Sequence, residues 1–121
     1  MVYTSANFLY ICPMKVLFKT TELEYYYITP LDELKGKLSF PKDVIKQFKK
    51  KVQFLLSITS IDELKLFNSL NLEKLKGDLT GQFSIRLNKQ YRLIFQTLDE
   101  SIGEVVLEIV LVNEISKHYK K

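Results

Sequence analysis

One hairpin constrains the fold of this chain more than any other feature. Two segments of alternating apolar and polar residues, 83–87 and 91–95, flank Asn88, Lys89 and Gln90. A three-residue loop pairs the segments so that one face is wholly apolar, whereas a two-residue loop would mix charged and apolar side chains on the same face. The alternation therefore predicts an antiparallel hairpin with one buried face.

The same register places two arginines together. Arg86 lies directly opposite Arg92 on the other face, with Ser84 beside them, and the hairpin contains no acid. Like charges directly opposite each other in antiparallel strands are destabilising. The side chains extend into water, or pair with Glu108 or Glu114 of the last strand, or meet a phosphate. If nothing in the protein neutralises them, replacing Arg92 should leave the stability unchanged.

A helix precedes the hairpin. It is predicted to begin at Phe40-Pro41, and its apolar residues recur at three- and four-residue spacing. These residues are Val44, Ile45, Phe48, Val52, Leu55 and Leu56. The opposite face carries Lys42, Lys46, Lys49, Lys50 and Lys51 against the single acid Asp43. That face is either solvated or attracts RNA phosphates or an acidic partner.

The order of the remaining elements predicts the fold class. They are a strand over 15–19, a short helix over 29–36, a second short helix over 60–67 that opens with a capping box, and a strand from 105 to 115 after a turn at 99–103. Helices first and strands afterwards predict an α+β domain, in which an antiparallel sheet carries the helices on one face.

The bulk composition limits the class of protein. The chain has 121 residues, of which 46% are hydrophobic and 26% charged, as in one soluble globular domain. The net charge of +4 and the pI of about 9.1 permit a nucleic-acid partner without requiring one. Cys12 and His118 are the single cysteine and the single histidine. We therefore expect a reducing, cytoplasmic environment, no zinc site and no cofactor.

The first thirteen residues differ from the rest. Residues 1–13 contain no charged side chain, and their apolar segment is too short to span a bilayer. No basic region precedes that segment, as a signal peptide would require. We therefore expect no membrane partner. We interpret residues 1–13 as an N-terminal extension, either flexible or produced by a start codon assigned too early, and residues 14–121 as a single domain.

His118 is a candidate for proton transfer. It follows the last predicted strand directly, and histidine is the side chain whose ordinary pKa, about 6.5, lies close to neutral pH. A lone histidine near a chain end is usually without function. Beside two unpaired arginines on a sheet, it becomes a candidate acid or base.

Four motifs follow one another in the second part of the chain. They are Leu75-Lys76-Gly77-Asp78, then Gly-Gln-Phe-Ser-Ile-Arg at 81–86, Tyr-Arg-Leu-Ile-Phe at 91–95, and Glu-Ile-Ser-Lys-His-Tyr at 114–119. In order and spacing they resemble the HigB-like branch of the RelE/ParE toxin superfamily, over about residues 14–119. The resemblance implies a compact RelE-like fold, a small antiparallel sheet with two or three helices on one face.

The resemblance also implies a function. Such toxins of type II toxin–antitoxin systems cleave messenger RNA on the ribosome and are neutralised by a cognate antitoxin, commonly a helix-turn-helix protein. Arg92 falls on the family's sheet arginine, His118 on its C-terminal histidine and Lys76 on the lysine of the Leu-Lys-Gly-Asp turn. Glu73 stands shortly before that lysine, where several relatives have a histidine, so a second catalytic histidine is absent.

We expect metal-independent cleavage in which the RNA 2′-hydroxyl attacks the adjacent phosphate. The expected catalytic residues are His118, Arg92, Arg86 and Glu73, and the expected RNA-binding residues are Lys76, Lys89, Tyr119 and Lys117. Two alternatives remain. One is a ParE-like protein that inhibits DNA gyrase without cutting RNA, and the other is an RNA-binding module without catalysis.

Overall fold

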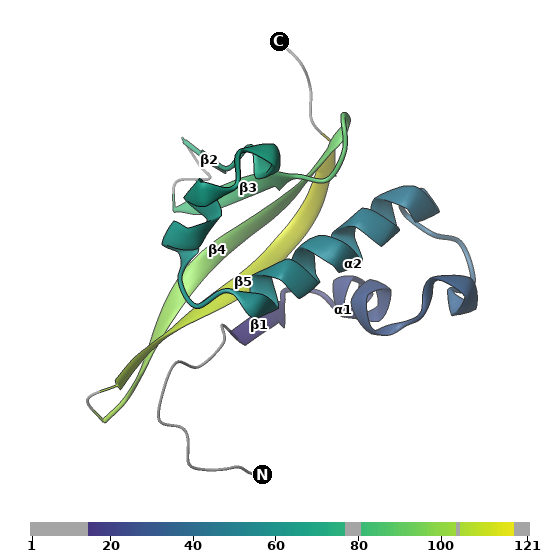
Figure 1. Ribbon diagram of the computed structural model, residues 1–121. Coiled ribbons are helices and arrows are strands. Elements are labelled where there is room, and N and C mark those ends of the chain that lie inside the picture. Colours follow the sequence, from purple (N-terminus) through teal and green to yellow (C-terminus); the bar gives the residue numbers. More distant parts are fainter. Residues whose placement is uncertain (1–14, 77–80, 104, 118–121) are drawn as a thin grey trace.

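The structure is a computed structural model that describes residues 15–76, 81–103 and 105–117. A sheet forms one layer and helices form the other (Figure 1), so the predicted α+β fold is confirmed. The α-helices and strands, in chain order, are β1 Lys15–Phe18, α1 Thr21–Ile28, α2 Lys42–Ser57, β2 Glu73–Lys74, β3 Gln82–Arg86, β4 Tyr91–Ile102 and β5 Val105–Lys117.

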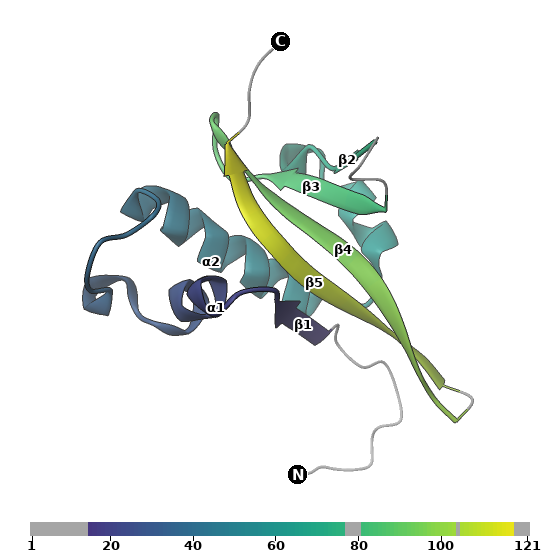
Figure 2. The same cartoon turned by 180° about the vertical axis from the view of Figure 1, so that it is seen from behind.

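The sheet has five strands in the order β1-β5-β4-β3-β2. Strands β2 to β5 pair antiparallel, as predicted, whereas β1 pairs parallel with β5. Parallel neighbours require a long crossover connection, and the helices between β1 and β2 belong to it. The sheet is therefore mixed. Figure 2 shows the face that points away from α1 and α2, which we call the open face.

The last two strands are longer than the sequence predicts. Residues 99–102 were expected in a turn, but β4 continues to Ile102 and β5 begins at Val105. Gly103 has a φ of +64°, a conformation that side chains with a Cβ rarely adopt. The turn can therefore be confined to the residues around this glycine, and the acids before it remain in the ladder.

Helix α2 matches its prediction closely. It follows Pro41, whose fixed φ suits a helix start, and it buries the predicted apolar stripe except for Leu56, which is half-buried. The lysines of the opposite face are not equivalent, however. Lys42, Lys46 and Lys50 are exposed, but Lys49 Nζ donates to the carbonyls of Tyr27 and Thr29, both at 2.7 Å, and of Tyr26 at 3.3 Å. Lys49 therefore joins α2 to the end of α1.

Helix α1 is absent from the sequence prediction. Its segment contains three consecutive tyrosines and buries only Leu23 and Tyr26, so no apolar stripe marks it. Thr20 caps it by accepting from Leu23 N at 3.2 Å. The helix predicted at 29–36 is wrong, because Thr29 ends α1 by donating to Tyr25 O. Only one 3₁₀ turn, Leu31–Glu33, follows.

The predicted capping box is also wrong. Ser60 Oγ accepts from Asp62 N at 3.2 Å, one residue earlier than a capping box requires. The Glu63 carboxylate accepts from Thr59 N at 2.9 Å and from the Thr59 hydroxyl. The segment winds as a 3₁₀ helix, Ile61–Leu66, and a second 3₁₀ turn, Asn68–Leu70, brings the chain to β2.

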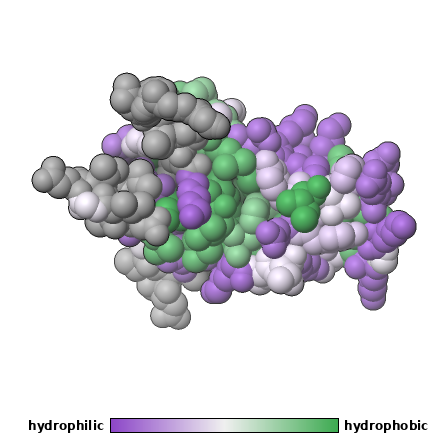
Figure 3. Space-filling view, turned by 90° about the horizontal axis from the view of Figure 1, so that it is seen from below, coloured by the Kyte–Doolittle hydropathy of each residue, from purple (hydrophilic) through white to green (hydrophobic). Residues whose placement is uncertain are grey.

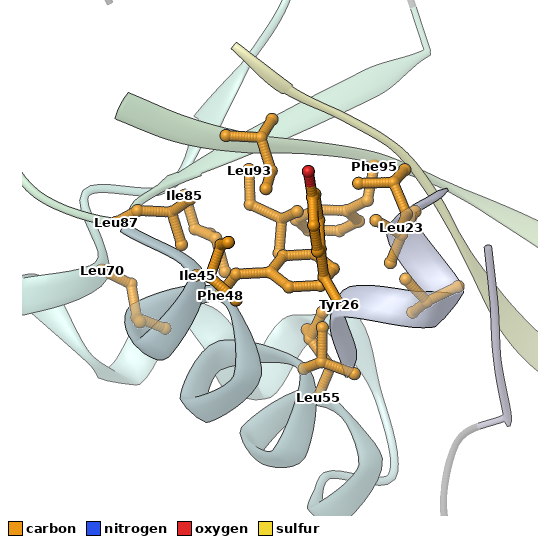
Figure 4. Close-up of a cluster of buried hydrophobic side chains, with 14 of the residues drawn as sticks. Leu23, Tyr26, Ile45, Phe48, Leu55, Leu70, Ile85, Leu87, Leu93 and Phe95 are labelled. Atoms are coloured by element: carbon orange, nitrogen blue, oxygen red, sulfur yellow. The ribbon is translucent and has the colours of Figure 1, made fainter. Parts of the chain in front are cut away.

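The core lies between α2 and the sheet. Figure 4 shows Phe48 of α2 beneath Leu93 and Phe95 of β4, with Tyr26 of α1 beside it. Phe48, Leu93 and Phe95 are completely buried. These contacts use the apolar side of the central hairpin and leave its polar side on the open face.

The surface is not uniformly polar. Seen from below (Figure 3), a hydrophobic area lies in the middle of the molecule, next to hydrophilic side chains that dominate its helical end. Among the side chains that the structure describes, six large hydrophobic ones are exposed: Leu17, Tyr25, Ile28, Leu66, Phe67 and Leu98. No helix in the described residues is long and apolar enough to cross a membrane.

Candidate functional site

The central hairpin has the predicted register. Arg86 lies opposite Arg92 and Ile85 opposite Leu93. Asn88 makes the connecting turn, because its Oδ1 accepts from Gln90 N and Tyr91 N, both at 2.8 Å. The three-residue loop and the two opposed arginines are therefore confirmed.

Cross-strand pairing defines two rows on the open face, since directly paired residues point to the same side of a sheet. One row contains Arg86, Arg92 and Ser116. The next row contains Glu73, Ser84, Ile94 and Glu114. The arginine pair therefore has acids only in the neighbouring row, at the two sides of the sheet.

Arg92 neither extends into water nor pairs with an acid. Its side chain is 8% exposed. Nε donates to Ser84 Oγ at 2.8 Å, and Nη2 donates to the Asn71 carbonyl and, at 3.4 Å, to the Ser84 carbonyl. The pairing with Glu108 or Glu114 is wrong for the described residues, where the one ion pair joins Lys65 and Asp62. Neutral oxygens hold this guanidinium.

Arg86 is half-buried and closer to the surface. Its Nε donates to the Asn88 carbonyl at 3.4 Å. With the Asn71 amide nitrogen turned toward the Asn68 carbonyl, the Asn71 amide oxygen accepts from Arg86 Nη1 at 3.1 Å. Asn71 therefore contacts both arginines, through its carbonyl and its side chain. A left-handed backbone, with φ of +48°, allows this arrangement.

The two arginines leave positive charge on the open face. Burial lowers the pKa of Arg92, the charge of Arg86 lowers it further, and the charge of Glu73 raises it. Arginine stays protonated despite these effects, because its ordinary pKa lies far above neutral pH. Glu73 therefore offsets part of the charge without forming a direct ion pair among the described residues.

A cleft of about 520 Å³ opens beside the arginines. It is lined by Asn71, Leu72, Glu73, Arg86, Asn88, Lys89 and Arg92. Three of these residues are cations and one is an acid. The structure thus brings together four of the eight residues predicted for the site: Arg86, Arg92, Glu73 and Lys89.

The other four predicted residues do not line this cleft in the described structure. Lys76 is exposed beyond the end of β2. Lys117 is the cross-strand partner of Tyr91, whose ring packs against Phe40 on the helical side of the sheet at 5.8 Å between centroids. Lys117 therefore lies on the wrong face for the arginines. His118 and Tyr119 lie outside the described residues.

Three residues of the cleft, Asn71, Leu72 and Asn88, are not among the predicted site residues, and two of them are polar. Asn88 was assigned only to the loop, although an asparagine at the start of a turn is a recognisable signal. Asn71 carries a weaker signal, since asparagine tolerates the left-handed conformation better than most residues. Its contacts with β3 and β4 could not be read from the sequence.

Comparisons with known proteins identify a family by sequence and a similar fold by structure. Residues 17–109 match the family model for the RelE-like toxin of the type II toxin–antitoxin system HigB. The chain is 35% identical over 86 residues to Toxin HigB-1 of Vibrio cholerae serotype O1, covering 71% of this chain and 86% of that protein. The YoeB/ParE toxin from Agrobacterium tumefaciens has a similar fold, with a TM-score of 0.52 at 16% identity over 88% of this chain and 100% of that one.

Proposed function

This chain belongs to the HigB-like family of RelE-like toxins of type II toxin–antitoxin systems, and we propose that it is a metal-independent endoribonuclease that cuts messenger RNA on the ribosome. The observation that supports this activity is the arginine cleft on the open face. The opposed Arg86 and Arg92 have no acid bound to them among the described residues. A phosphate between them would supply the missing anion.

The hydrogen bonds suggest how the two arginines share the phosphate. Arg92 uses Nε and Nη2 on Ser84 and Asn71, and none of the hydrogen bonds among the described residues involves its Nη1. Arg86 uses Nε and Nη1, and none of the hydrogen bonds among the described residues involves its Nη2. Each guanidinium thus keeps one nitrogen for a ligand while the others fix its place. Such fixed donors stabilise transition-state charge without having to reorganise.

The proposed reaction is transesterification within the RNA. A base takes the proton of the 2′-hydroxyl, whose oxygen bonds to the adjacent phosphorus. The bond from phosphorus to the 5′-oxygen breaks, and an acid protonates that oxygen. The products are a 2′,3′-cyclic phosphate and a 5′-hydroxyl. We assign the base to Glu73, which lines the cleft, and the acid to His118, two residues after Ser116, the partner of Arg92.

Primer extension on a defined messenger RNA in a translating extract tests this activity. Arg86→Ala should lower cleavage by about a hundredfold or more, because the transition state loses a fixed cation. His118→Ala should lower it by roughly 10²–10⁴. Lys46→Ala is the matched control, since Lys46 is equally basic but exposed on α2, away from the cleft. Intact transcripts together with failing DNA supercoiling would instead support the gyrase inhibitor.

We also propose that a cognate helix-turn-helix antitoxin neutralises the chain. Toxins of this family belong to type II toxin–antitoxin systems, and a chain of net charge +4 suits an acidic partner. Association of the two proteins should slow with added salt. Association rates that do not change between low and high salt would contradict an electrostatic interface.

A further inference from the structure

A second hollow adjoins the arginine cleft. It measures about 480 Å³ and shares Asn71 and Leu72 with the cleft. Its other lining residues are Leu64, Lys65, Phe67 and Asn68. A third hollow of about 280 Å³ shares Phe67 with the second and includes Lys50 and Lys51. The three hollows follow one another along a path on the surface, because each shares a lining residue with the next. We call the second and third hollows the Phe67 groove.

Phe67 is the most distinctive residue of this path. It is an aromatic side chain with 44% of its surface exposed. Its ring meets the ring of Phe54 at 5.0 Å and 85°, an edge-to-face contact that holds it in place. Its backbone is also fixed, since Phe67 N donates to Leu64 O at 3.2 Å and Phe67 O accepts from Leu70 N at 3.1 Å. The groove therefore presents a fixed aromatic surface.

The charge along the path identifies the class of its occupant. The lining residues of the three hollows include six cations, Lys50, Lys51, Lys65, Arg86, Lys89 and Arg92. Glu73 is the one acid among them. Lys65 forms an ion pair with Asp62, but both side chains are exposed, and an exposed pair is weak enough for Lys65 to bind another anion. Such a path attracts a polyanion.

We propose that the Phe67 groove binds the single-stranded RNA next to the cleavage site, with a base stacked on Phe67 and phosphates near Lys50, Lys51 and Lys65. Basic grooves with exposed aromatic rings bind single strands in this way. Asn68 also lines the groove, and an asparagine amide can bond to a base edge. This inference rests on the proposed function, because the arginine cleft must hold the scissile phosphate. An acidic peptide is the rival occupant.

The test measures binding of RNA that the protein cannot cut. Oligoribonucleotides with 2′-O-methyl groups lack the attacking hydroxyl, and fluorescence anisotropy reports their affinity for the full chain. One probe of about three nucleotides fits the arginine cleft alone, and one of about eight extends into the groove. Phe67→Leu should weaken binding of the long probe by about fivefold or more and leave the short probe unchanged. Phe67→Trp, which keeps a ring, should preserve binding of the long probe.

Matched variants separate the groove from general effects. Leu66→Ala is the control, because Leu66 is a neighbour that is 76% exposed and lines none of the three hollows. It should bind both probes normally. Replacing Lys50 and Lys51 by alanine should reduce the salt dependence for the long probe alone, by about 0.7 in the logarithmic slope for each phosphate that the lysines no longer neutralise.

The possible failures point to different conclusions. If Arg86→Ala weakens both probes but Phe67→Leu binds the long one normally, the groove proposal is overturned while the proposed function stands. If neither probe binds the unmodified chain, the proposed function fails first. If Phe67→Leu impairs capture of an acidic helical peptide and leaves RNA binding intact, the groove is a protein-binding site. Equal loss on both probes in Phe67→Leu and Phe67→Trp would show a structural role for the ring and also overturn the proposal.

Discussion

Replacing Arg92 should destabilise the protein, contrary to what the hairpin sequence alone predicts. On the sequence, removal of one of two opposed arginines relieves repulsion and costs nothing. In the structure Arg92 is 8% exposed, and its guanidinium donates to Ser84 and Asn71. Arg92→Ala therefore removes the donor of two acceptors, one of which, Ser84, folding has taken out of water.

The expected size follows from these contacts. A hydrogen bond from a charged donor contributes about 1.5–3 kcal/mol. The bond to Ser84 Oγ should count almost fully, because Ser84 is 1% exposed. The Asn71 carbonyl belongs to an exposed residue, so water can replace much of its bond. Relief of repulsion from Arg86 returns about 0.2–1 kcal/mol. The net loss should be about 2 kcal/mol.

Equilibrium unfolding in urea, followed by circular dichroism, measures this loss. Arg86→Ala is the matched control and should change the free energy of unfolding by less than about 1 kcal/mol, since Arg86 is closer to the surface. Combining Arg92→Ala with Ser84→Ala should cost less than the sum of the single changes, because the two side chains share a bond. An Arg92→Ala protein within about 0.5 kcal/mol of the parent would refute this account.

Three further predictions concern the rest of the chain. Lys49→Met should lower the free energy of unfolding by about 1–2 kcal/mol in urea, because three carbonyls lose their donor, whereas Lys46→Ala should be neutral. Hydrogen bonds from Thr59 lower the pKa of Glu63, so its charge stabilises the fold above its usual value of 4.5, and this stabilisation is lost as the pH falls through the lowered pKa. Glu63→Gln should therefore have a lower unfolding midpoint than the parent at neutral pH, and the two midpoints should converge once the pH falls below the lowered pKa of Glu63. A chain that starts at Met14 should fold and remain toxic, with a melting temperature close to that of the full chain; aggregation would show that residues 1–13 pack on the core.

The parts of the fold that were predictable are those with a strict period. The α2 stripe repeats every three to four residues and buries one side of a helix. The central hairpin alternates around Asn88, and a shift of one residue would have exposed Ile85 and Leu93. Because burial enforces both patterns, the sequence determines the register that opposes Arg86 and Arg92.

The parts that were not predictable depend on contacts between distant segments. Helix α1 buries only two residues and contains a run of tyrosines that no helical pattern marks. The carbonyls of Tyr27 and of Thr29, the residue that ends the helix, accept from Lys49, which lies twenty or more residues later in the chain. The periodic pattern of α2 gives no sign that this lysine differs from Lys46 or Lys50. The sequence pattern cannot distinguish lysines on one helix face, because they differ only in the tertiary contacts that each one makes.

The arginine site shows the same limit, and it changes how the two arginines should be interpreted. Their opposition follows from the hairpin, but the oxygens that hold them come in part from Asn71, thirteen residues before Ser84. Asn71 reaches both because its backbone is left-handed. Arg92 is consequently the fixed, buried member, and Arg86 is the more accessible one. If this division is correct, Asn71→Gly, which keeps the backbone conformation and loses the amide, should impair RNA cleavage through Arg86 while the carbonyl continues to hold Arg92. Cleavage should fall while the urea midpoint changes little. A loss of cleavage accompanied by a clearly lower urea midpoint would show that Asn71 supports the fold and not the position of Arg86.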